Sequence, residues 1–105
     1  MNKLDFALDK IKEESAEVIQ AACKIDHFGF WSTDPTNPTS RYNIVAFHSE
    51  LNDLLAAVAF MNQVLEEKPS LQFMPDYDYI VEKVKKLEKY YHIVSSLKGT
   101  ENENQ

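Results

Sequence analysis

The chain has 105 residues, of which 44% are hydrophobic and 27% charged, proportions that are typical of one soluble globular domain. Its net charge of −6 argues against a sequence-independent nucleic-acid binder, because such a protein needs a basic surface. Cys23 is the single cysteine and excludes an intramolecular disulfide, and the sequence has neither an 18-residue apolar run nor an apolar signal core, so we expect a cytoplasmic protein without a membrane span.

Residues 3 to 25 are predicted to form the first helix, because they lack glycine and proline and repeat apolar residues at helical spacing. A loop over residues 26 to 42 follows, since this segment contains Gly29, two prolines and many other turn-forming residues. A loop of this length in a small domain is more often functional than a plain connection.

The second helix is predicted from about residue 43 to 67, with Asn43 as its N-cap, because asparagine is favoured at that position. A second loop, rich in proline, covers residues 68 to 75.

The third helix is predicted over residues 76 to 98. Its apolar residues alternate four and three apart, as in a coiled-coil seam: Ile80, Val84, Leu87, Tyr91 and Val94. Gly99 is the expected stop, so we predict one helical domain over residues 1–99 and a disordered tail over residues 100–105.

The predicted fold is therefore all-α, with long antiparallel helices of roughly 33 Å each. A hairpin of such helices buries little surface on its own. We expect the core to be completed by homo-oligomerisation, as a four-helix type of bundle.

Two segments share one pattern of apolar and acidic residues, one ending at Val18 and the other at Leu54. The first contains Glu14 and Glu17, and the second contains Glu50 and Asp53. Residues three apart lie on one face of a helix. If the two helices pack together, all four carboxylates enter one space, where they repel one another unless a cation joins them.

Carboxylates without cysteine or histidine favour the hard cations Mg²⁺, Mn²⁺ or Ca²⁺. A di-iron bundle would require Glu-x-x-His, and the sequence contains no such motif. The alternative is that both acidic pairs are ordinary solvated faces of helices.

Three stretches, residues 13–21, 24–29 and 50–55, together resemble the MazG-like nucleotide pyrophosphohydrolases of the all-α NTP pyrophosphatase superfamily. The resemblance covers about residues 5 to 95 and centres on the paired ExxE and ExxD motifs. Members of this family are helical dimers or tetramers that cleave a nucleoside triphosphate between its α and β phosphates with Mg²⁺, releasing a monophosphate and pyrophosphate.

The resemblance implies metal-binding and catalytic roles for Glu14, Glu17, Glu50 and Asp53, with Mg²⁺ or Mn²⁺ as the cofactor. Which carboxylate is the general base stays open. The 32 residues between Glu17 and Glu50 exceed the spacing in compact members, and the excess lies in the loop.

Further candidates could contact a phosphate or a base of the substrate: Lys24, Trp31, Asn43, Lys83 and Lys86. Each has a structural alternative: a solvated lysine at a helix end or on a helix face, an aromatic loop anchor, or a helix cap. The alternative to an enzyme is a non-catalytic helical interaction or nucleotide-sensing module, and we expect no nucleic-acid or membrane partner.

Overall fold

The computed structural model describes residues 2–37 and 41–103, and for residues 99–103 it describes the backbone alone. The chain divides into two units, residues 1–73 and 74–105, and each is described here by itself. All regular secondary structure in the described part is helical, so the predicted all-α class is confirmed.

Helix α1 (Lys3–Phe28) has a defined cap at each end. The Asn2 Oδ1 accepts a hydrogen bond from the Asp5 backbone N–H at 2.8 Å, which caps the start. At the other end Gly29 has a φ of 91°, a value that favours glycine, and its N–H bonds the Ile25 carbonyl at 2.7 Å. The helix therefore ends at Phe28 and not near residue 25, because Gly29 is the first residue suited to this turn.

Helix α2 (Asn43–Val64) begins with Asn43 inside the helix, and its N-cap is Tyr42. The prediction that Asn43 caps the helix is wrong. Its side chain is 3% exposed, and its Nδ2 donates to the Gly29 carbonyl at 3.0 Å and the Lys24 carbonyl at 3.4 Å. An N-cap side chain would instead accept a bond from its own helix. Asn43 thus ties the start of α2 to the end of α1.

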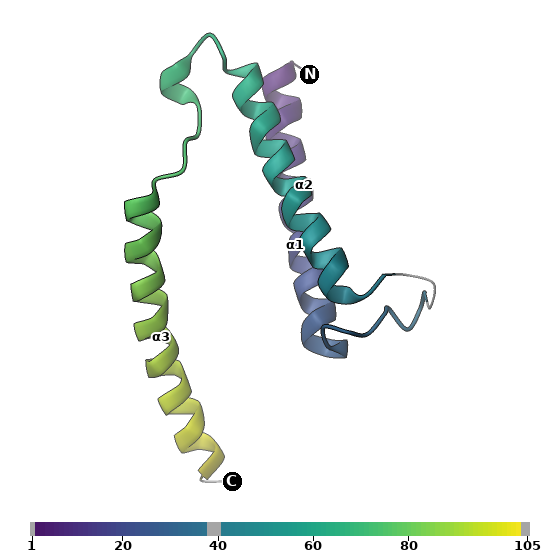
Figure 1. Cartoon of the computed structure of the whole chain (residues 1–105), viewed down its shortest axis with the longest axis vertical. Helices are drawn as coiled ribbons and strands as arrows, with labels where there is room; N and C mark the ends of the chain where they lie inside the picture. The colour runs from purple at the N-terminus through teal and green to yellow at the C-terminus, as the bar shows by residue number, and fades with distance from the viewer. Residues whose placement is uncertain (1, 38–40, 104–105) are drawn as a thin grey trace. The chain divides into compact units, whose positions relative to one another are not determined.

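The helices α1 and α2 lie side by side and run antiparallel (Figure 1). Three of the buried apolar residues along the pair are alanines, Ala7, Ala21 and Ala57, which allow two helix backbones to approach closely. Near one end of the pair, the Phe6 and Phe60 rings meet edge to face at 5.9 Å between centroids.

Helix α2 ends at Val64, earlier than the predicted residue 67, and a short 3₁₀ helix, η1 (Pro69–Leu71), follows. Asn62 holds the segment after η1 against α2. Its Nδ2 donates to the Phe73 carbonyl, and its Oδ1 accepts from the Phe73 N–H, both at 2.8 Å.

Helix α3 (Tyr77–Glu103) forms the regular structure of the second unit. It continues through Gly99, so the predicted stop at that residue is wrong, and residues 100–103 of the predicted tail are helical. Glycine within a helix costs only about 1 kcal/mol, and no proline follows it. Residues 104–105 of the predicted tail lie outside the described residues.

By length and composition alone, α2 is long and apolar enough to cross a membrane, although no membrane span was expected from the sequence. The core helix of a soluble protein passes the same test. The helix also carries Glu50 and Asp53 in its middle. The cytoplasmic location therefore stays a prediction.

Replacing Asn43 by alanine should lower the free energy of unfolding by about 1–3 kcal/mol, because the Gly29 and Lys24 carbonyls lose their donor in a part-buried place. Urea denaturation followed by circular dichroism measures this. Asn52→Ala is the matched control, because Asn52 is an exposed asparagine on the same helix; its effect should stay within about 0.5 kcal/mol. Equal losses for the two variants would contradict the tie between the helices.

Candidate metal centre

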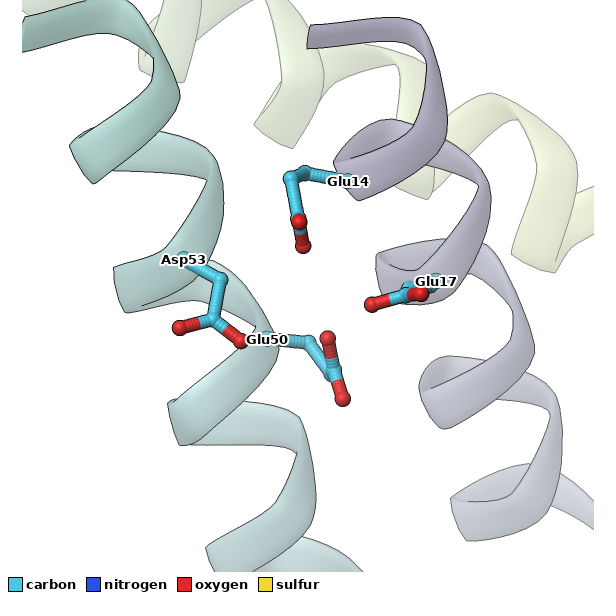
Figure 2. Close-up of side chains that lie close together, drawn as sticks. All are labelled: Glu14, Glu17, Glu50 and Asp53. Atoms are coloured by element: carbon cyan, nitrogen blue, oxygen red, sulfur yellow. The ribbon is translucent and has the colours of Figure 1, made fainter. Parts of the chain in front are cut away.

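Helices α1 and α2 bring the four acids of the repeated motif into one cluster. Glu14 and Glu17 come from α1, Glu50 and Asp53 from α2, and the side chains point toward one another across the space between the helices (Figure 2). One carboxylate oxygen of each lies within 4.8 Å of one from every other member. The three-residue spacing puts the two acids of each pair on one face of their helix, and in the antiparallel packing of α1 and α2 these two faces lie opposite each other.

The two acids of each pair differ in burial. Glu14 and Glu50 are half-buried, whereas Glu17 and Asp53 are exposed. The Oε2 atoms of Glu14 and Glu50 are shielded from solvent and have no hydrogen-bond partner. A buried carboxylate oxygen without a partner is unfavourable, so the cluster has vacant acceptors at its most buried point.

The cluster raises the pKa of two of its members. Burial, then the negative charges of Glu17 and Asp53, raise the pKa of Glu14. Hydrogen bonding with Glu17, then burial and the charges around it, raise the pKa of Glu50. Both shifts mean that the ionised cluster is unfavourable without a compensating positive charge.

The donors fit a hard divalent cation. All four members of the cluster offer carboxylate oxygens, which suit Mg²⁺, Mn²⁺ or Ca²⁺, and neither histidine nor cysteine belongs to the group. The partnerless oxygens of Glu14 and Glu50 are the acceptors that such an ion would satisfy. Acidic clusters also occur without ions, so metal binding by these residues stays a prediction.

A hollow of about 260 Å³ adjoins the cluster. Its wall includes Glu17 and Glu50 from the cluster and, from further along α1, Gln20 and Lys24. The predicted phosphate contact Lys24 therefore lies beside the acids, and the hollow presents charges of both signs.

Asp34, in the loop between the helices, forms an ion pair with Lys24. Asp34 was not among the candidate site residues predicted from the sequence. The Lys24 Nζ lies 3.3 Å from the Asp34 Oδ2. The Asp34 Oδ1 accepts hydrogen bonds from the Thr36 N–H at 2.9 Å and from its hydroxyl at 2.6 Å. These bonds and Lys24 lower the pKa of Asp34. The Asp-Pro-Thr sequence at this position is typical of an Asx turn, and this pattern is the sequence signal from which the turn at Asp34 could have been predicted.

Trp31 is 74% exposed and meets the Tyr42 ring edge to face at 6.0 Å. Its ring is therefore not buried within residues 1–73, although it contacts the residue that precedes α2. Stacking of Trp31 on a base stays a prediction.

The amide of Asn43 is occupied by the backbone of α1, which supports a structural role for this residue. Lys83 and Lys86 are exposed residues of α3 in the other unit. Substrate contacts by all three stay predictions.

Glu13 lies next to the cluster in sequence but not in the site. It is exposed, and its Oε2 accepts a hydrogen bond from the Lys10 Nζ at 2.9 Å. Glu13 is therefore a natural control for changes to the cluster.

Comparison with protein-family models, curated proteins and solved structures gives no significant match for this chain. The resemblance to MazG-like enzymes thus rests on the motifs in the sequence.

Replacing Glu50 by glutamine should raise the melting temperature of the metal-free protein by a few degrees, because one of four repelling charges is removed without a change of shape. The same change should reduce the further stabilisation that added Mg²⁺ produces. Thermal unfolding with EDTA and with Mg²⁺ measures both effects, and Glu13→Gln should change both far less, because the charge of Glu13 is the smallest of the influences that raise the pKa of Glu14. A lower melting temperature of the Glu50→Gln variant in EDTA would contradict the electrostatic argument.

The stability of the metal-free protein should fall as the pH rises above 4.5, the ordinary pKa of Glu14 and Glu50. Through the interval up to the raised pKa values, the folded protein holds more protons than the unfolded chain, so raising the pH favours unfolding. Above that interval the loss is complete, and Mg²⁺ should stabilise most because protons no longer compete.

Melting temperatures across this interval, in EDTA and in Mg²⁺, test the pH dependence. A double variant with glutamine at positions 14 and 50 should flatten the EDTA curve. A melting temperature in EDTA that rises through the interval for the unmodified protein would refute the assignment.

Proposed function

We propose that the protein is a Mg²⁺-dependent nucleoside triphosphate pyrophosphohydrolase that produces a nucleoside monophosphate and pyrophosphate. One observation carries the proposal: four carboxylates converge from two helices, and two buried oxygens among them have no partner. The motif resemblance supplies the phosphate chemistry, which the cluster alone does not specify.

The charges of the cluster constrain what it can bind. A polyphosphate cannot approach four carboxylates without an intervening cation, because like charges repel. Bound Mg²⁺ would supply that bridge and lower the pKa of an attacking water. Glu14, Glu17, Glu50 and Asp53 would hold the ion, and which of them accepts the proton of the water stays open.

Lys24 is placed to contribute a positive charge from the same hollow. A lysine ammonium on this wall would meet the charge that develops on the phosphate oxygens and on the leaving pyrophosphate. The hollow therefore offers a cation site and a phosphate-binding group from one pair of helices.

We also propose that the working form is a homo-oligomer, a dimer or tetramer in which helices pair into a four-helix type of bundle. The buried apolar residues in the described part of the chain are few, and no large side chain is fully buried. Within its own unit, α3 has no second helix against which to pack its apolar stripe. Association of subunits is the ordinary way for such a chain to complete a core.

The proposal predicts release of pyrophosphate from one or more members of a panel of ribo- and deoxyribonucleoside triphosphates in the presence of Mg²⁺. Glu50→Gln and Asp53→Asn should lower kcat/KM by at least about 100-fold, because each removes a ligand of the metal. Glu13→Gln should keep activity near that of the unmodified protein. Pyrophosphate release and chromatography of the nucleotide product measure the reaction.

The same panel separates the proposal from the alternative functions. A nucleotide sensor would bind a nucleotide with Mg²⁺ and release no pyrophosphate, and a helical interaction module would bind neither. Full turnover by the Glu50→Gln and Asp53→Asn variants would refute the assignment of the site.

A further inference from the structure

The hollow beside the cluster is lined by a lysine, whose ammonium could compete with a metal ion for the carboxylates. Lys24 lies seven residues after Glu17, so both residues occupy the same face of α1. Side chains of a helix lean toward its N-terminus, which directs Lys24 toward Glu17. Both residues line one hollow with Glu50.

A lysine in this position would ordinarily pair with the nearest unsatisfied carboxylates. Such a pair forms within one molecule, so the ammonium competes with a dissolved ion at a high effective concentration. Glu50 also lines this hollow, and its Oε2 has no hydrogen-bond partner. Nevertheless, the ion pair that Lys24 makes is with Asp34 of the loop, at 3.3 Å.

Hydrogen bonds within the loop orient the carboxylate of Asp34 toward Lys24. Its Oδ1 accepts both hydrogen bonds from Thr36, and its Oδ2 faces the ammonium. The side chain of Asp34 is 21% exposed, and that of Lys24 is 48% exposed. The loop therefore presents an oriented and partly shielded carboxylate to a more exposed lysine.

We propose that Asp34 is a positioning residue that holds the Lys24 ammonium at the edge of the hollow, away from Glu17 and Glu50, and so keeps these carboxylates free for a divalent cation. This inference rests on the metal site of the proposed function. It assigns to the loop a role in metal affinity.

The test measures Mn²⁺ binding to the nucleotide-free protein from the electron paramagnetic resonance signal of free Mn²⁺, and it needs no catalysis. Asp34→Asn should weaken binding by about two- to fivefold, the range expected when one partly exposed ion pair is exchanged for another. Asparagine can still accept the Thr36 bonds, so the turn should persist. Asp26→Asn is the control, because this substitution makes the same chemical change at an exposed residue on a different face of α1. The control substitution should leave the affinity for Mn²⁺ unchanged.

A double-mutant cycle with Lys24→Met identifies the cause. Without the lysine, Asp34→Asn should no longer weaken Mn²⁺ binding, and Lys24→Met alone should change the affinity less than Asp34→Asn does. If Asp34→Asn weakens binding equally with methionine at position 24, Asp34 acts through its own charge and the proposal is wrong. If Lys24→Met alone tightens binding strongly, the lysine already occupies the acids, and the proposal is also wrong.

The failures of the two proposals are distinguishable. Absence of Mn²⁺ binding by the unmodified protein would overturn the metal site and this inference with it. Binding by the unmodified protein with an unchanged affinity in the Asp34→Asn variant, shown by circular dichroism to be folded, would overturn this inference alone.

Discussion

The close antiparallel packing of α1 against α2 is the constraint on which the other features of residues 1–73 depend. Small side chains such as Ala21 and Ala57 permit the approach, and Asn43 ties the two helices together where the loop joins them. The same packing forces four carboxylates into one space. Their repulsion is unfavourable in the metal-free protein, as the raised pKa values of Glu14 and Glu50 indicate. The acidic cluster that we propose as a cation site therefore lies at the interface of the two helices.

The loop between these helices contacts both of them. Its backbone meets the start of α2, where the Asn43 N–H donates to the Ser32 carbonyl at 2.8 Å. Asp34 in the same loop pairs with Lys24 beside the acids. The position of one lysine therefore depends on a turn ten residues later in the chain. If the acids bind a cation as we propose, this ion pair gives the long loop a way to affect the site without contributing a ligand to it.

The proposed chemistry and the proposed assembly are linked through exposed apolar surface. Two packed helices suffice to collect the four acids, yet they leave large apolar side chains such as Ile19 and Leu55 uncovered. The apolar stripe of α3 likewise needs a partner helix. In a bundle of several subunits these surfaces would become buried, and the environment of the acids would become drier, which strengthens the binding of ions.

Much of this fold could be predicted from local sequence signals. Apolar periodicity predicted the three helices, and the three-residue spacing of acids on two of them predicted the two acidic pairs, because both depend only on the geometry of a single helix. The ends were less predictable: Asn43 lies within α2 because its amide bonds α1, and α3 continues through Gly99. The pairing of Asp34 with Lys24 could not be predicted from sequence, because the two residues lie on different elements. The sequence by itself determined which side chains share a helix face. Only the tertiary structure decided which faces meet, and hence that the acids converge and that Lys24 pairs with Asp34, because contacts between elements depend on packing across the whole unit.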